Sequence, residues 1–265
     1  MDAPEPPVSA LVGLRVIDLS RDVAGAYAAR LLADLGAYVL RVEPPAGPAE
    51  GASLEWLHAG KRSVTIDLTR EEGAALLRAL ALDFDVLIDD RPPGELDGLG
   101  LGYEALAAVK PRLVYVSVTP FGVHGPAAGR TATDAALFAA AGLDGAACGP
   151  YAARLRAGLH AFAATLTAVY SALVKEVGHQ VEIATIETLA ATLPPGARAA
   201  SSPSVSDGLK AQPFDSAQDR PFALSGAPVA NGPAPSPGEH TEEVLFGELE
   251  IDPEEFARLR AEGVV

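Results

Sequence analysis

The chain has very few sulfur-containing residues. Its 265 residues include one cysteine, Cys148, and one methionine. A single cysteine excludes an internal disulfide and a metal cluster held by cysteines, and it fits a reducing compartment such as the cytoplasm. The five histidines are His58, His124, His160, His179 and His240, and no two of them stand at metal-binding spacing. We therefore expect no metal site.

Basic residues are also scarce. Lysine and arginine together number 20, against 35 acidic residues, which gives a formal net charge of −15. A surface this negative repels phosphate backbones, so we expect no nucleic-acid partner. A small polyanion can still bind where basic groups or helix N-termini are concentrated.

Long apolar runs are missing too. No uninterrupted run approaches the ~20 residues that cross a bilayer. Residues 1–5 are acidic and proline-rich, unlike the basic start of a signal peptide. The apolar fraction of 49% is nevertheless sufficient for a large core. We expect a soluble, cytoplasmic protein with no membrane partner.

The pattern of apolar residues alternates between short strands and helices over the first 190 residues. We predict strands at 15–19, 38–43, 63–68, 85–88, 113–118 and 180–184. Helices are predicted at 26–35, from 70 with Thr69 as N-cap, and at 103–109, 134–141, 158–175 and 185–193, with a turn at 22–25. Strands interleaved with helices indicate βαβ units, so the fold class is α/β with an open, doubly wound, mostly parallel sheet.

Three regions follow from the change in composition along the chain. Residues 1–193 form the predicted Rossmann-like domain, and 194–237 form a linker rich in proline, glycine and serine that we expect to be disordered. Residues 238–265 form a short helical tail, in which Asp252 and Pro253 are typical of a helix start.

Common catalytic and nucleotide-binding motifs are not present. Gly60-Lys61 lacks the first glycine of a phosphate-binding loop, since Glu55 stands in its place. Gly98, Gly100 and Gly102 do not have the spacing of a dinucleotide fingerprint, and a flexible loop is the better interpretation. No Gly-x-Ser-x-Gly elbow of a hydrolase occurs.

An ordered set of short segments resembles a known family. RVIDLSRDVAG (15–25), LGAYV (35–39), GKRSV (60–64), DVLI (85–88), LGLGYE (99–104) and SVTPFG (117–122) occur in order, and 238–245 and 259–265 complete the set. Together they are similar to the class III CoA-transferases, which include formyl-CoA transferase, carnitine CoA-transferase and alpha-methylacyl-CoA racemase. The resemblance implies a Rossmann-like large domain and transfer of CoA between an acyl-CoA thioester and a carboxylic acid.

The resemblance also implies a CoA-binding groove and no permanently bound cofactor, because the CoA thioester is the substrate. Val23, Ala24 and Gly25 would lie against CoA, and Asp90, Pro93 and Gly94 would line the same groove. Lys61 and Arg62 would face its phosphates, and they are adjacent basic residues in an acidic chain. On sequence alone, a solvated Lys-Arg turn explains that pair equally well.

The reactive acid of the family falls on an arginine in this sequence. In the family an aspartate attacks the thioester and then carries CoA, and it stands four residues before a glycine that opens a long helix. Gly158 takes the place of that glycine, which puts Arg154 at the acid position, and a guanidinium is not a nucleophile. Residues 150–159 contain no acid, and the nearest in sequence are Asp144 and Glu176. The catalytic residue is therefore unknown at this point.

The second domain of the family is also missing from the sequence pattern, because segment 194–237 stands where that domain would be. Three interpretations remain open: a CoA-transferase, a catalytically inactive CoA-binding accessory protein, or a gene fragment. The expected partners are an acyl-CoA and a small carboxylic acid. A homodimer would differ from the interlocked dimer of the family, since the threading linkers and second domain are lacking.

Overall fold

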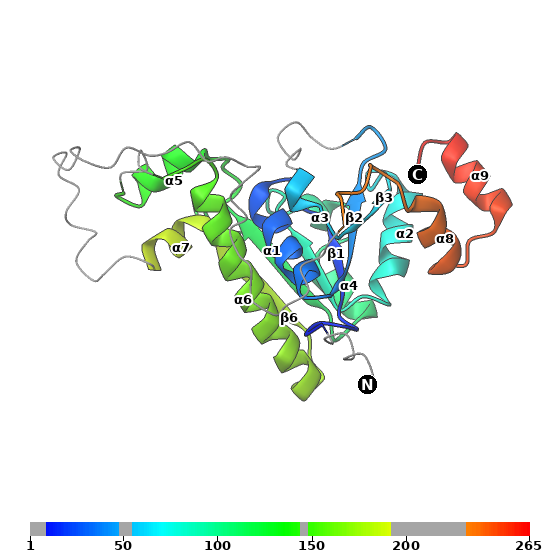
Figure 1. The fold of residues 1–265 in the computed structure, drawn as a ribbon, viewed down its shortest axis with the longest axis horizontal. Helices are drawn as coiled ribbons and strands as arrows, with labels where there is room; N and C mark the ends of the chain where they lie inside the picture. Colours follow the sequence, from blue (N-terminus) through cyan, green and yellow to red (C-terminus); the bar gives the residue numbers. More distant parts are fainter. Residues whose placement is uncertain (1–8, 48–54, 144–147, 192–231) are drawn as a thin grey trace, which may run out of the picture.

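The structure, a computed structural model, describes residues 9–47, 55–143, 148–191 and 232–265. Most of the predicted linker 194–237 lies outside these residues, so its disorder stays a prediction. The described part of the first 191 residues forms an α/β unit, with the tail helices at one end of it (Figure 1).

The centre of the fold is a six-stranded sheet in the order β3-β2-β1-β4-β5-β6. Every neighbouring pair of strands is parallel. The predicted fold class and all six predicted strands are confirmed. Their bounds are β1 Arg15–Asp18, β2 Tyr38–Glu43, β3 Arg62–Thr65, β4 Val86–Asp89, β5 Val114–Thr119 and β6 His179–Ala184.

Helices cover both faces of the sheet, because successive strand residues point to opposite sides. Ile17, Leu40 and Leu87 pack toward the face that holds α2 and α4. Their neighbours Val16 and Val39 pack against α1 and α6 on the other face. The helices are α1 Val23–Asp34, α2 Glu71–Ala81, α3 Glu95–Gly98, α4 Tyr103–Val109, α5 Asp134–Ala140, α6 Ala152–Lys175, α7 Thr185–Ala191, α8 Thr241–Gly247 and α9 Pro253–Ala261, with a 3-10 turn η1 Glu55–Leu57.

Three helix starts differ from the predictions. The predicted turn at 22–25 is wrong, because α1 already begins at Val23 with Asp22 as its N-cap. The helix α2 begins at Glu71 with Arg70 at the N-cap position, in place of Thr69. The helix α6 begins at Ala152, six residues before Gly158. Arg154 therefore lies in the first turn of α6 and not in a loop before it.

The tail packs against the β3 edge of the sheet (Figure 1). The His240 N–H donates to the Ser63 carbonyl at 2.9 Å, and the Thr65 N–H donates to Thr241 Oγ1 at 3.0 Å. The predicted helix start at 252–253 is confirmed, since Asp252 caps α9 and Pro253 is its first residue. These contacts cover backbone groups that an edge strand would otherwise expose.

The helix α6 is the longest in the described residues. Its 24 residues reach a mean hydropathy of 1.5 over an 18-residue window, which is enough by length and composition to cross a membrane. The sequence expectation concerned uninterrupted apolar runs, whereas α6 meets this test through its mean hydropathy and contains Arg154, Arg156 and His160. Ala157, Ala161 and Ala168 of α6 are nonetheless buried against the sheet and α1. The same test is passed by core helices of soluble proteins.

Candidate functional site

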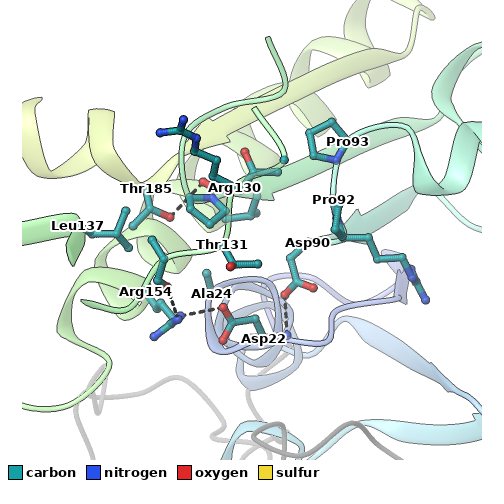
Figure 2. Close-up of a pocket in the computed structure, with 16 residues that line it drawn as sticks. Asp22, Ala24, Asp90, Pro92, Pro93, Arg130, Thr131, Leu137, Arg154 and Thr185 are labelled. Atoms are coloured by element: carbon teal, nitrogen blue, oxygen red, sulfur yellow. Dashed lines mark hydrogen bonds and ion pairs between the residues drawn. The ribbon is translucent and has the colours of Figure 1, made fainter. Parts of the chain in front are cut away.

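A cavity of about 240 Å³ lies at the carboxyl ends of β1, β4 and β5 (Figure 2). Ligands of open parallel sheets bind at this edge, where the order of strands reverses. The loop after each strand contributes: Asp22 follows β1, Asp90 follows β4, and Pro120 follows β5. Arg154 enters from the first turn of α6. The remaining lining residues are Ala24, Arg91, Pro92, Pro93, Val118, Thr119, Gly129, Arg130, Thr131, Ala132, Leu137 and Thr185.

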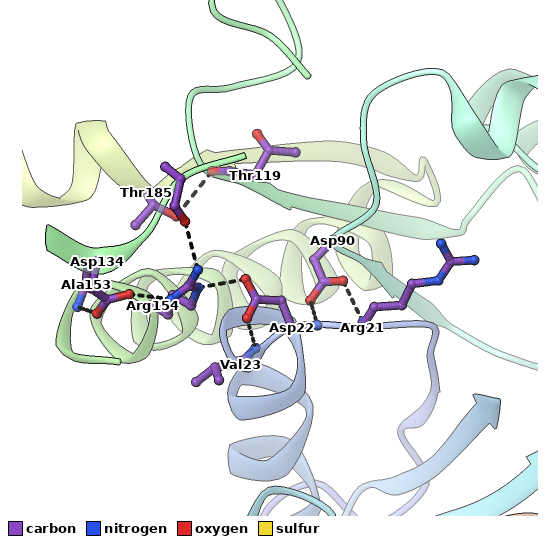
Figure 3. A network of polar contacts seen from close by, with 10 residues as sticks. Arg21, Asp22, Val23, Asp90, Thr119, Asp134, Ala153, Arg154 and Thr185 are labelled. Carbon is purple, nitrogen blue, oxygen red and sulfur yellow. Dashed lines mark hydrogen bonds and ion pairs between the residues drawn. The ribbon is translucent and has the colours of Figure 1, made fainter. Parts of the chain in front are cut away.

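Arg154 makes three side-chain hydrogen bonds at this cavity. Its Nε donates to Asp22 Oδ2 at 2.7 Å, and its Nη1 donates to Asp134 Oδ1 at 2.6 Å (Figure 3). Its Nη2 donates to the Ala132 carbonyl at 2.8 Å. One guanidinium thus connects α6 with the loop after β1 and with the start of α5. Such charge-assisted bonds are roughly twice as strong as neutral ones.

The two carboxylates that hold Arg154 also cap helices. Asp22 Oδ1 accepts the Val23 N–H at 2.7 Å at the start of α1. Asp134 Oδ2 accepts the Ala153 N–H at 2.9 Å and so caps α6, whose own N-cap residue, Tyr151, makes no side-chain cap bond. Both carboxylates lie where the helix dipole favours negative charge.

Asp90 holds the loop between β1 and α1. Its Oδ1 accepts the Arg21 N–H at 2.6 Å, and its Oδ2 accepts the Asp22 N–H at 2.9 Å (Figure 3). Burial raises the pKa of Asp90 well above the ordinary value, and the nearby Asp89 and Asp22 charges act in the same direction. The two N–H bonds oppose this shift without cancelling it.

The structure brings together several of the residues predicted to contact CoA. Ala24, Asp90 and Pro93 line the cavity. Gly94 lines an adjoining cavity of about 210 Å³ that shares Pro93. Val23 is buried in the first turn of α1 and does not line either cavity.

Gly25 is also buried, and its lack of a side chain matters. A Cβ atom on Gly25 would lie 2.7 Å from Ser20 Cβ and 2.9 Å from Asp90 Oδ2. The close approach of α1 to the loop after β4 therefore requires glycine at this position.

Neither Lys61 nor Arg62 lines these cavities, and the side chains of the two residues have different partners. Lys61 is buried, and its Nζ donates to Asp18 Oδ2 at 2.6 Å and to the Ala26 carbonyl at 2.9 Å. A phosphate contact by Lys61 does not fit this geometry, because the ammonium is fully enclosed. Arg62 is partly exposed at the sheet edge and forms an ion pair with Glu243 of α8.

The buried pair of Asp18 and Lys61 explains why a lysine follows Gly60. Burial alone would raise the pKa of Asp18, but the Lys61 ammonium outweighs it, so the pKa of Asp18 is lowered. Burial lowers the pKa of Lys61, against the opposing effect of Asp18. A charge enclosed in this way persists only when it is paired.

Two features of the cavity were missed by the sequence interpretation. The search for a second acid considered only neighbours in sequence, whereas Asp22 and Asp134 contact Arg154 from 132 and 20 residues away. Thr119 was not singled out either. Its Oγ1 is buried and has no hydrogen-bond partner within the described residues. The N-cap position of Asp22 before an alanine-rich helix was a signal for that residue.

Metal binding finds no support at this cavity. Within the described residues, no group of three or more histidine, cysteine or carboxylate side chains is arranged to hold a metal ion.

Comparison with known proteins identifies a family and several relatives. The sequence model described as CoA-transferase family III matches residues 11–208. The chain is 41% identical over 143 residues to the succinyl-CoA:(R)-benzylsuccinate CoA-transferase subunit BbsE of Thauera aromatica, covering 48% of this chain and 35% of that protein. It is 36% identical over 185 residues to a succinate–glutarate CoA-transferase of Agrobacterium fabrum, covering 63% and 45%.

Solved structures give the same picture. A CAIB/BAIF family protein from Brucella suis is similar with a TM-score of 0.63 and 33% identity, covering 70% of this chain and 55% of that one. The chain thus spans less than half of the length of either curated relative and about half of the solved structure.

Proposed function

The chain belongs to CoA-transferase family III, and on that premise we propose that it transfers CoA between an acyl-CoA thioester and a carboxylic acid. The observation that carries the proposal is the cavity at the carboxyl ends of β1, β4 and β5. Ala24, Asp90 and Pro93, three positions predicted for the CoA groove, line it together. The CoA thioester is the substrate, so the proposal requires no permanently bound cofactor.

Val23 and Gly25 would support the groove from within α1, and Gly94 would extend it into the adjoining cavity. Of the basic pair, Arg62 is the remaining candidate for a CoA phosphate that extends beyond the cavity, since its side chain is partly exposed and would have to exchange Glu243 for the phosphate, while Lys61 is enclosed. We expect Arg62→Gln to weaken CoA binding about tenfold, as the loss of one charge-assisted bond predicts. Pantetheine lacks the nucleotide phosphates, so its binding should not change, and calorimetry with both compounds separates the two cases.

The acyl donor to test first is succinyl-CoA, because the curated relatives are named for succinyl-CoA or succinate. The assay follows exchange of CoA from succinyl-CoA to glutarate and to a panel of other free acids. Thr131→Trp, which narrows the cavity, should abolish exchange, whereas Thr167→Trp on the exposed side of α6 should not. No exchange above background by folded protein would end the transferase proposal.

A second candidate function is CoA binding without turnover, and Arg154 is the observation that favours it. A guanidinium occupies the predicted acid position and is held by three hydrogen bonds. This candidate predicts thermal stabilisation by millimolar CoA, because a ligand that binds only the native state raises its melting temperature. It also predicts no exchange in the assay above.

We propose a cytoplasmic location and a homodimer that differs from the interlocked form. The family's second domain would be lacking, with segment 194–237 in its place. Light scattering of the purified chain measures the oligomeric state, and resequencing of the locus tests whether the short middle segment is genuine or the product of a broken gene.

A further inference from the structure

Three carboxylates surround the position of Arg154, and they differ in their access to the cavity. Asp22 and Asp90 line the cavity, while Asp134 contacts Arg154 from the far side and does not line it. If the chain transfers CoA as proposed above, one carboxylate must replace the acid that the family keeps at position 154. The choice between them follows from exposure and access to the cavity, because both oxygens of each of the three carboxylates accept hydrogen bonds.

Asp134 and Asp90 are poorly suited to attack a thioester. The Asp134 side chain is 16% exposed, and its two oxygens accept bonds from Arg154 and from the Ala153 N–H. Asp90 uses both oxygens to hold the backbone N–H groups of residues 21 and 22, so moving it would release the loop that begins α1. Its raised pKa also reduces the fraction in the nucleophilic, ionised form.

Asp22 has the access that the other two lack. Its side chain is 46% exposed and lines the cavity. Its Oδ2 lies 2.7 Å from Arg154 Nε, so its carboxylate is next to the side chain at the predicted acid position (Figure 2). It directly precedes Val23 and Ala24, which the family resemblance assigns to the CoA groove.

We propose that Asp22 supplies the carboxylate that attacks the acyl-CoA thioester, in place of the residue at position 154. This inference rests on the proposed transferase function. An oxygen of Asp22 adds to the thioester carbonyl carbon, the carbon–sulfur bond breaks, and CoA leaves as a thiolate while a mixed anhydride remains on Asp22.

The thiolate then adds to Cγ of Asp22. The bond from Cγ to the bridging oxygen breaks, the donor acid leaves as a carboxylate, and CoA is held as an aspartyl thioester. The acceptor carboxylate attacks Cγ and expels the thiolate, which takes the acceptor acyl group from the new anhydride and regenerates the Asp22 carboxylate. Charge and atoms balance without any further reactant.

Arg154 is a positioning residue in this scheme. Its bonds to Asp134 and to the Ala132 carbonyl hold the guanidinium beside Asp22. A guanidinium has more N–H donors than the three contacts use, so it can also donate to the oxyanion formed next to Asp22. Thr119 Oγ1, which is buried and has no hydrogen-bond partner in the part of the chain that the structure describes, is a second hydroxyl donor among the lining residues of the cavity.

The test compares Asp22→Asn with Asp252→Asn in the succinyl-CoA exchange assay. Both residues are helix N-caps, and asparagine is as good a cap as aspartate, so both variants should fold. We expect Asp22→Asn to lose at least about a thousandfold in exchange rate and Asp252→Asn to lose none. Thermal unfolding of the two variants verifies that the cap is retained.

Chemical trapping gives a readout that a structural role would not move. Protein incubated with succinyl-CoA is reduced with borohydride, which converts an aspartyl thioester to the alcohol, and the modified peptide is identified by mass spectrometry. Reduction at position 22 supports the inference, and reduction at Asp90 or Asp134 overturns it. Full exchange by Asp22→Asn also overturns it and leaves the transferase function standing. No exchange by the folded wild-type chain overturns both.

Discussion

Replacing Arg154 by aspartate would introduce the residue type that the family resemblance predicts at this position, and we expect this substitution to destabilise the protein. The guanidinium forms ion pairs with both Asp22 and Asp134, whose oxygens lie 2.7 and 2.6 Å from its nitrogens. Arg154→Asp removes the only cation in this contact and adds a third carboxylate beside the two. We expect lower stability and no gain of CoA exchange.

The size of the effect follows from two contributions. Removing one partner of a buried ion pair costs about 3–5 kcal/mol, but Arg154 is 20% and Asp22 46% exposed, so about 2 kcal/mol is a fairer figure here. Two unit charges ~4 Å apart repel by about 4 kcal/mol at an effective dielectric constant of ~20. The Asp22 side chain can turn toward solvent, which weakens this repulsion to about 1–2 kcal/mol. The total of about 3–4 kcal/mol is a large part of the stability of a typical domain.

Urea unfolding at about pH 8 and about pH 5 measures both contributions. Arg154→Met removes the positive charge without adding a negative one and serves as the matched control. At the higher pH we expect wild type to be most stable, followed by Arg154→Met and then Arg154→Asp. Protonation of one of three crowded carboxylates relieves their repulsion, so the gap between the two variants should narrow at the lower pH. Equal stability of the two variants at both pH values would refute this account of Arg154.

Three further predictions concern the surroundings of the cavity. Lys61→Met leaves the enclosed Asp18 carboxylate without its ammonium partner and should cost about 3–5 kcal/mol in urea unfolding, and adding Asp18→Asn should recover part of that loss. The raised pKa of Asp90 gives stability that is present below its ordinary pKa and lost as the pH rises through the raised value. Asp90→Asn should flatten this part of the stability–pH profile, and a profile unchanged by the substitution would contradict the assignment. Gly158→Ala puts a Cβ 2.6 Å from the Ala24 carbonyl oxygen and should lower the free energy of unfolding by about 1–3 kcal/mol.

The centre of the sheet could be predicted from the sequence because its inner strands β1, β4 and β5 contain short apolar runs. Parallel strands are buried on both faces, so Val86, Leu87 and Ile88 are all fully buried although they alternate between the two cores. Helix starts were harder to predict. The first turn of α6 contains Arg154 and Arg156 among alanines, and its cap comes from Asp134, 20 residues earlier. The residues next to the start of α6 in the sequence give no indication of that contact.

The side chains of Lys61 and Arg62 point away from each other for a geometric reason. Lys61 directly precedes β3, and Arg62 is its first residue. Side chains of successive residues in extended backbone point to opposite faces. Lys61 accordingly turns inward to Asp18, while Arg62 turns outward to Glu243. Two adjacent basic residues at the start of a strand are therefore weak evidence for one shared phosphate site.

The contacts of Arg154 give a physical reason for an arginine at the position where the family resemblance predicts an acid. This side chain fastens the loop after β1, the start of α5 and the first turn of α6 to one another, and all three border the cavity. An arginine that only filled the place of a lost acid would not need two carboxylates and a carbonyl as partners. Asp22, Asp134 and Arg154 form one electrostatic unit, so a change at position 154 alone alters the charge balance of its neighbours as well. An experiment that introduces an aspartate at position 154 must therefore also remove a neighbouring carboxylate, for example with Asp134→Asn. The comparison is between Arg154→Asp alone and Arg154→Asp combined with Asp134→Asn.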